Sequence, residues 1–145
     1  MRDPYGWQDI RRTDPRVHVA AACLEVDDRR EHQGLIVDLA PRGVRLERPY
    51  HGGPTPTDVY LEILIPELGD VVIARAAPTF DLVRDALVPA AGPFGLVRRT
   101  GYRIVEAAAR DLRLLRDFVF ELRRARRAED GVYDELLDAS CYARG

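Results

Sequence analysis

Three arginines lie close together near the start of the chain, in the segment DIRRTDPRVHV (residues 9–19). Arg12 and Arg16 are separated by three residues, and Arg11 lies beside them. In an extended chain, residues at this spacing span roughly 13 Å or less, so two guanidinium groups can hold one ligand from different sides. Guanidinium groups bind phosphate and the O6/N7 edge of guanine. The spacing indicates either a ligand carrying guanine and phosphate or a solvated, charged leader.

A second polar segment, DLAPRG (residues 38–43), joins two apolar runs. Asp38 ends the first run, where its carboxylate can accept hydrogen bonds from guanine N1–H and N2–H or hold an arginine in place. We expect Gly43 to permit a backbone conformation, or a close approach, that a Cβ would obstruct. Aspartate, proline and glycine are also the ordinary residues of a β-turn, which is the alternative interpretation.

The other reactive residue types argue against an enzyme. The only serine is Ser140, far from any rigid strand-to-helix turn that a Ser-His-Asp hydrolase needs. The chain has no lysine, which excludes Schiff-base and P-loop chemistry. The histidines do not have the spacing of metal ligands: His18, His32 and His51. The sequence therefore predicts a binding protein without catalytic residues, metal or cofactor.

The composition predicts one cytoplasmic domain. A length of 145 residues suits a single core, and a net charge of −2 argues against a protein that binds DNA or RNA by bulk electrostatics. The two cysteines lack CxxC spacing, and Cys23 lies in an apolar run typical of a core. No run approaches the ~20 apolar residues of a membrane span, and the N-terminus lacks a signal-peptide core.

Apolar residues alternate in a series of short runs, which predicts about six strands at the spacing of a sandwich or barrel. The runs cover residues 17–26, 35–40, 43–47, 59–65, 71–77, 79–88 and 94–105, with a charged turn at 27–34. After Glu106, apolar residues at helical spacing predict an amphipathic helix of roughly five turns: Ala108, Leu112, Leu115, Val119 and Leu122. We expect this helix to cover an open end of the sheet; a dimer seam is the alternative.

These elements divide the chain into three parts. We expect residues 1–16 to form a flexible N-terminal arm that carries the arginines, residues 17–127 to form the β-domain with its helix, and residues 128–145 to form an acidic tail.

Four segments together resemble the PilZ domain family over about residues 9–125: RRTDPRVHV, GLIVDLAPRGVRLE, VYLEILIPE and TGYRIVEAAARDLRLLRDFVFEL. That family has an RxxxR arm and a [D/N]xSxxG turn, and it binds the bacterial second messenger cyclic di-GMP. The resemblance implies a mainly β fold, namely a six-stranded antiparallel split β-barrel with a C-terminal amphipathic α-helix.

The resemblance also implies a binding site. Arg12 and Arg16 match the RxxxR arginines that hold the guanines and phosphates, and Asp38 and Gly43 match the first and last positions of the turn motif. Ala40 stands where the motif has serine, and a lost neutral hydrogen bond costs about 0.5–1.5 kcal/mol, or roughly a few-fold to tenfold in affinity.

Two further residues complete the expected site. Arg11 lies beside the RxxxR arginines, and Arg42 adds a cation within the turn that offsets part of the loss at position 40. Pro41 stiffens the same turn.

Three hypotheses follow for the function. The first is a cyclic di-GMP receptor, monomeric or homodimeric, in which ligand binding orders the arm and a downstream protein reads the change. The second is a PilZ-like adaptor that acts by protein contact without nucleotide, which the alanine at position 40 favours. The third is a nucleic-acid-binding barrel that uses the arginine-rich helix, against which the acidic balance counts.

Overall fold

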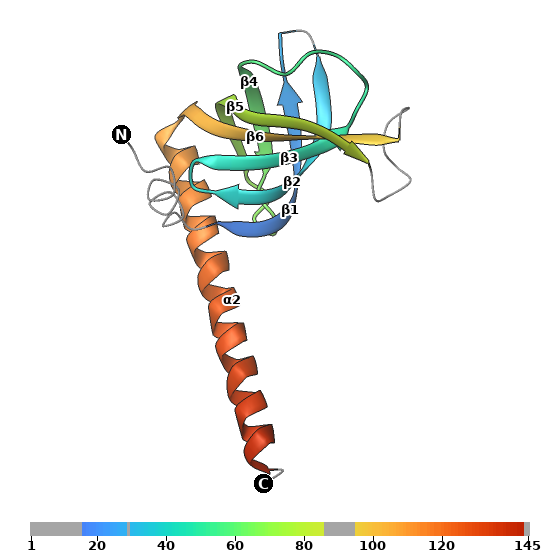
Figure 1. Ribbon diagram of the computed structural model, residues 1–145. Coiled ribbons are helices and arrows are strands. Elements are labelled where there is room, and N and C mark those ends of the chain that lie inside the picture. The colour runs from blue at the N-terminus through green and yellow to red at the C-terminus, as the bar shows by residue number, and fades with distance from the viewer. Residues whose placement is uncertain (1–15, 29, 86–94, 144–145) are drawn as a thin grey trace, which may run out of the picture.

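The protein is described by a computed structural model that covers residues 16–28, 30–85 and 95–143, with side chains up to Glu129. It contains six β-strands and one long helix (Figure 1). The elements are β1 (Val17–Val26), β2 (Glu31–Ala40), β3 (Gly43–Pro49), β4 (Val59–Leu64), β5 (Val71–Asp85), β6 (Leu96–Ala107) and α2 (Ala109–Ala143).

The strands form a closed barrel in the order β1-β2-β3-β6-β5-β4, and every neighbouring pair is antiparallel. Closure leaves no unpaired sheet edge. The structure confirms the expected fold class, a six-stranded antiparallel barrel followed by a C-terminal helix.

The core lies inside the barrel and follows the alternation of the sequence. In β4, Val59, Leu61 and Ile63 are buried while the residues between them are exposed. Cys23 is buried in the same interior, and this burial raises the pKa of its thiol to about 12. A thiol with so high a pKa is inert, so the prediction that Cys23 is a core residue is confirmed.

Two predicted strand boundaries were wrong. The turn between β1 and β2 is much shorter than residues 27–34, because two hydrogen bonds close it at Asp27. The Asp27 backbone N–H donates to Arg30 O, and the Asp27 carboxylate accepts from the Arg30 backbone N–H. Strand β2 therefore begins at Glu31, paired with Val26. The runs 71–77 and 79–88 belong to one strand, since β5 passes through Pro78 with a register shift just after it and a bulge tolerates a proline.

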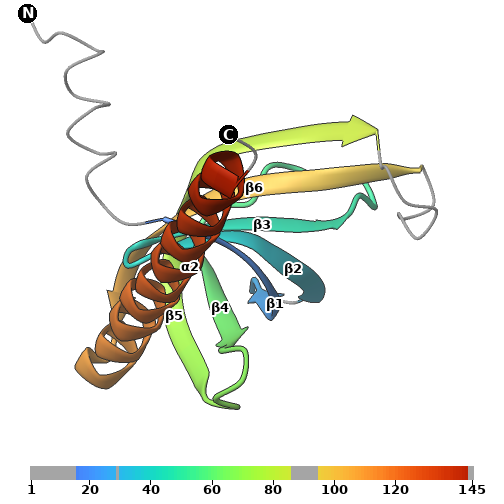
Figure 2. The ribbon, with the colours of Figure 1, turned by 90° about the horizontal axis from the view of Figure 1, so that it is seen from below.

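Helix α2 packs against one side of the barrel, at the left in Figure 1, and then continues away from it (Figures 1 and 2). Leu115 and Val119 are fully buried against the core, and Asp111 accepts a hydrogen bond from the backbone N–H of Ile73 at 3.2 Å. The helix has 35 residues, a length of about 50 Å. It is therefore longer than the expected five turns and includes residues 128–143, where we expected a separate tail.

Leu112 and Leu122 also pack on the core, whereas Ala108 is exposed and precedes the helix. Within the described chain, no helix has the length and apolar character needed to cross a membrane.

Candidate ligand-binding site

Three irregularities in strand pairing surround one region of the barrel surface. The β1–β2 register shifts between His18 and Ala21, the β2–β3 register shifts just before Asp38, and the β5–β6 register shifts just before Phe80. A bulge adds one residue to a strand and redirects the side chains that follow it. Side chains from several strands are thereby directed toward the same place.

The bulge in β2 decides the orientation of Asp38. Strict alternation from Ile36, which is buried in the core, would point Asp38 inward. Instead Asp38 pairs with Arg45, whose neighbours Val44 and Leu46 fill the core from the opposite face of β3. The Asp38 carboxylate therefore lies on the outer face of the barrel, beside the guanidinium group of Arg45.

Three basic side chains surround this carboxylate at long distances. Oδ2 of Asp38 lies 4.0 Å from Arg16 Nη1 and 3.8 Å from Arg45 Nη1, and Oδ1 lies 3.9 Å from His18 Nδ1. The Asp38 side chain is only 6% exposed, and Oδ1 is buried without a hydrogen-bond partner among the described residues. A buried acceptor left unpaired costs about 1–3 kcal/mol. The site thus holds an oxygen atom prepared to accept an N–H or O–H group.

A small cavity of about 80 Å³ opens at this carboxylate. It is lined by residues from five segments of the chain: Arg16, Asp38, Leu39, Ala40, Gly43, Val44, Arg45, Thr79, Phe80, Gly101 and Tyr102. This volume accepts the edge of a ring and not a whole nucleotide. A larger ligand must therefore lie over the cavity mouth with one group inserted.

An aromatic ring forms one wall of the cavity. Phe80 packs against Gly101, where an added Cβ would lie 2.1 Å from Phe80 Cε1, and the residue is 39% exposed. The guanidinium carbon of Arg45 lies 5.7 Å from the ring centre, within cation–π range. Thr79 donates a hydrogen bond to Gly101 O at 3.2 Å. The cavity combines a carboxylate, two arginines and an aromatic face, a set suited to a polar heteroaromatic ring.

The structure brings together four of the predicted site residues. Arg16, Asp38, Ala40 and Gly43 all line the cavity. Arg42 does not: its side chain is exposed outside the lining, and its backbone carbonyl accepts a hydrogen bond from Ile104 N–H. Arg11 and Arg12 lie outside the described residues, so their role in the site stays a prediction.

We expected Gly43 to be needed for a special backbone conformation or for a close approach, and the fold itself requires neither. Its φ angle is not in the left-handed region, and an added Cβ would meet Tyr102 O at 3.8 Å and Ala40 Cβ at 3.9 Å, which are ordinary contacts. The β2–β3 turn forms equally well with a small side chain here. Gly43 therefore matters at this position only if a ligand approaches its Cα.

Sequence reasoning missed Arg45, Phe80 and Gly101. Arg45 could have been found, because a two-residue turn at Pro41 and Arg42 brings the second residue beyond Gly43 close to Asp38. No signal in the sequence identified Phe80 and Gly101. They reach the site through a bulge in a strand that pairs with β6 far along the chain.

A second polar cluster lies inside the barrel near the other end of the β1–β2 hairpin. Glu25 is 1% exposed; its Oε2 accepts a hydrogen bond from Arg48 Nε at 2.8 Å, and its Oε1 accepts one from the Tyr102 hydroxyl at 2.7 Å. Burial and the neighbouring carboxylate raise the pKa of Tyr102, which keeps the phenol protonated as the donor. Each carboxylate oxygen of Glu25 therefore accepts a short hydrogen bond.

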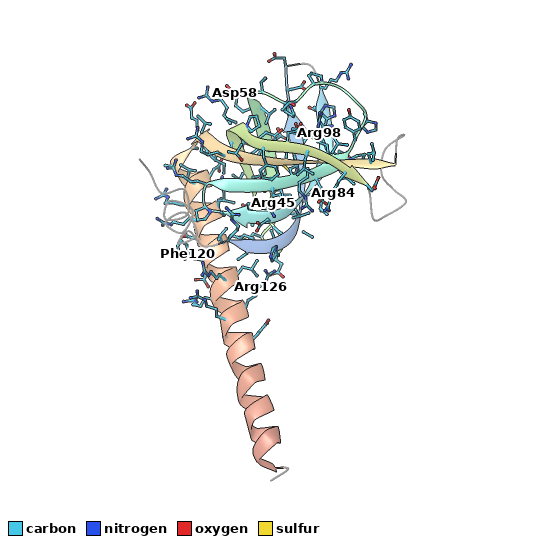
Figure 3. All side chains as sticks on the ribbon, viewed as in Figure 1. Arg45, Asp58, Arg84, Arg98, Phe120 and Arg126 are labelled. Carbon is cyan, nitrogen blue, oxygen red and sulfur yellow. The ribbon has the colours of Figure 1, made fainter. Side chains whose placement is uncertain are left out.

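A larger cleft of about 780 Å³ opens beside this cluster, between the β1–β2 turn and the loop at residues 51–57. Its floor contains Arg48 and Arg98, and Figure 3 labels Arg98 at this end of the barrel. Each lies beside a carboxylate that balances its charge: Arg48 Nε is 2.8 Å from Glu25, and Arg98 Nε is 3.3 Å from Asp81 without a hydrogen bond in the described chain. The floor therefore offers an incoming anion little uncompensated positive charge, and we place the candidate site at Asp38, near Arg45 (Figure 3). Among the residues that the structure describes, no cluster could hold a metal ion.

Comparison with known proteins identifies the type of fold. The barrel is similar to the PilZ domain with c-di-GMP of YcgR from Escherichia coli, with a TM-score of 0.61 and 16% identity over 83% of this chain and 98% of that one. It is also similar to the Bacillus subtilis inhibitor of motility MotI/DgrA, with a TM-score of 0.61 and 16% identity over 79% of this chain and 52% of that one. The protein therefore has a PilZ-type fold.

No family model matches the sequence, and no curated protein matches it. The match to MotI/DgrA spans about half of that protein, 52% of its length. At 16% identity, both likenesses establish the fold alone.

Proposed function

We propose that this protein is a non-enzymatic receptor for cyclic di-GMP, located in the bacterial cytoplasm. The observation that carries the proposal is the buried, unpaired Oδ1 of Asp38 in a cavity that also contains Arg16, Arg45 and Phe80. The similarity in fold to a PilZ domain described with c-di-GMP supports it.

Each group has a chemical role toward a guanine nucleotide. The Asp38 carboxylate accepts the guanine N1–H and N2–H groups, which satisfies the orphaned oxygen. Arg16 and, from outside the described residues, Arg12 bind the phosphates and the O6/N7 edge of the bases. Arg11 adds positive charge, Arg42 contributes from the turn, and Gly43 allows the ligand to approach the backbone.

The arm at residues 1–16 provides the signal in this proposal. A ligand held by both Arg12 and Arg16 on one side and by Asp38 on the other fixes the arm against the barrel. The surface that a downstream protein contacts then differs between the free and the liganded receptor, so ligand concentration controls the partner's binding.

Isothermal titration of the full chain with cyclic di-GMP tests the proposal. We expect saturable binding by the wild type and a loss of roughly 10- to 100-fold in affinity for Asp38→Ala, because a hydrogen bond to a charged group is worth about 1.5–3 kcal/mol. Arg16→Ala should bind more weakly still, since it loses contacts to both phosphate and base.

A matched control is Arg84→Ala. Arg84 is an exposed arginine whose guanidinium group pairs with Glu47 at 3.0 Å, outside the cavity. It should bind as the wild type does. Affinity unchanged in both Arg16→Ala and Asp38→Ala would show that the ligand, if it binds, binds elsewhere.

One observation favours a second candidate function, an adaptor that contacts protein partners without nucleotide. Ala40 lines the cavity with a methyl group where the PilZ turn motif has a hydroxyl group. Ala40→Ser separates the two functions. A receptor should bind up to roughly tenfold more tightly with the serine, whereas a wild-type protein that shows no heat and gains binding only as Ala40→Ser is an adaptor with a degenerate site.

A further inference from the structure

The outer surface of β4 and the first part of β5 is unusually apolar for an exposed sheet. Tyr60 (55% exposed), Leu64 (44%), Val71 (46%) and Ile73 (49%) point outward, and Leu68 (57%) lies in the turn between the strands. We call these five residues the β4–β5 face. Outward positions of a barrel in water are ordinarily polar, and contiguous apolar patches mark contact sites.

Strand register makes this face continuous. Leu64 pairs with Val71, Glu62 pairs with Ile73, and Tyr60 pairs with Arg75, so the side chains stand in three adjacent rows. All five side chains stay 44–57% exposed, and helix α2 reaches only one edge of the face, where Asp111 accepts a hydrogen bond from the Ile73 backbone N–H. The strand order places the face across the barrel from the β2–β3 hairpin that carries Asp38.

Two charged groups on the β4–β5 face are incompletely paired. Glu62 is exposed between Tyr60 and Leu64, and it makes no ion pair or hydrogen bond with the described residues. Arg75 binds Glu106 through Nη2 at 3.5 Å, while its Nε has no hydrogen-bond partner in the described chain. The same face therefore presents an acid at Glu62 that is unpaired within the described residues and, one row away, the 40% exposed side chain of Arg75.

We propose that the β4–β5 face binds the same face of a second copy of this chain, forming a two-fold dimer. In such an interface every contact occurs twice, so a surface that presents both an acid and a base complements itself. A two-fold axis parallel to the strands sets β4 of each copy over β5 of the other. Glu62 then lies one row from the second copy's Arg75, within reach of a long side chain.

The β4–β5 face, not the helix, is the surface to test. The barrel is closed, so backbone pairing between copies is excluded and the dimer depends on side chains alone. The apolar rows provide the buried area, and the Glu62–Arg75 pairs fix the orientation of the copies. The dimer does not depend on nucleotide, because the cavity at Asp38 is on the other side of the barrel.

Sedimentation velocity over a range of protein concentrations measures the dimer. The wild type should shift from monomer to dimer as concentration rises, and Ile73→Lys should raise the dissociation constant by at least ~10-fold, because it places a charge at the centre of the interface. Leu82→Lys is the matched control: Leu82 is 43% exposed on the same strand but far from the face, and this variant should dimerise normally.

Charge reversal gives a sharper test. Glu62→Arg and Arg75→Glu should each weaken the dimer, because each opposes like charges twice. An equimolar mixture of the two variants should form a heterodimer in which both pairs are complementary, and the double variant E62R/R75E should dimerise by itself. A wild type that is monomeric at all concentrations, a dimer insensitive to Ile73→Lys, or a mixture that stays monomeric would each overturn the proposal.

Discussion

The two acidic groups near opposite ends of the β1–β2 hairpin have similar burial and very different surroundings. Glu25 is 1% exposed and accepts hydrogen bonds of 2.8 Å from Arg48 and 2.7 Å from Tyr102. Asp38 is 5% exposed, its three basic neighbours stand 3.8–4.0 Å away, and Oδ1 has no hydrogen-bond partner among the described residues. One carboxylate is satisfied by the fold, and the other is held ready for a partner.

This difference separates a structural charge from a binding charge. A buried ion pair with short hydrogen bonds becomes costly only when one member is removed, because the other is left uncompensated. A buried carboxylate with long contacts already carries part of that cost in the free protein. A ligand that supplies the missing donor recovers the lost energy, and such strain at a site is a mark of function.

Glu25→Ala should produce the largest loss of stability. It leaves Arg48 buried without its counter-ion, which costs about 3–5 kcal/mol of unfolding free energy. Urea denaturation followed by circular dichroism measures the change. Asp38→Ala is the comparison, and it should not destabilise the fold, because no hydrogen bond to Oδ1 from the described residues is lost and an unpaired buried acceptor is removed. Equal losses in the two variants would break the distinction between the clusters.

Gly101→Ala should have an intermediate effect, because its Cβ would overlap the Phe80 ring at 2.1 Å and displace it from the cavity wall. We expect a loss of about 1–3 kcal/mol in stability together with weaker ligand binding. Gly43→Ala is the control for the fold: its Cβ meets only ordinary contacts, so thermal unfolding should match the wild type. A destabilised Gly43→Ala alongside an unaffected Gly101→Ala would contradict this description of the site.

The smallest expected effect concerns His32, beside the Glu25 cluster. Burial and the charge of Arg48 lower the pKa of His32 below its ordinary value of 6.5. The unfolded chain therefore takes up the proton first, and the stability that neutral His32 contributes above pH 6.5 is lost as the pH falls toward its lowered value. Between roughly pH 7 and pH 5, the urea midpoint of the wild type should fall more than that of His32→Gln. A parallel fall in both would exclude the histidine as the cause.

The sequence predicted the fold where local pattern and environment agree. The alternation of Val59, Leu61 and Ile63 gave the inner face of β4 correctly, and the spacing of Leu115 and Val119 gave the buried side of the helix. Patterns of this kind predict burial correctly because the burial of each residue depends only on its position within its own strand or helix.

The site was only partly predictable, because bulges interrupt the two-residue period. Asp38 was found as the residue that ends an apolar run, but its outward orientation depends on a register shift that the sequence does not signal. Phe80 was missed for the same reason, since a second shift turns it toward β6. The role assigned to Arg42 stays a prediction, because its side chain is exposed on the turn and lies outside the cavity lining.

Tyr102 joins the two clusters, since this residue lines the cavity at Asp38 while its hydroxyl group donates a hydrogen bond to Glu25 inside the barrel. That wall of the cavity cannot shift without breaking a buried hydrogen bond. The barrel side of the site is consequently a rigid template whose shape is set at folding. Any conformational change that slows ligand association must therefore occur in groups outside the barrel wall. Substitutions in the wall should change the dissociation rate of the complex more than its association rate.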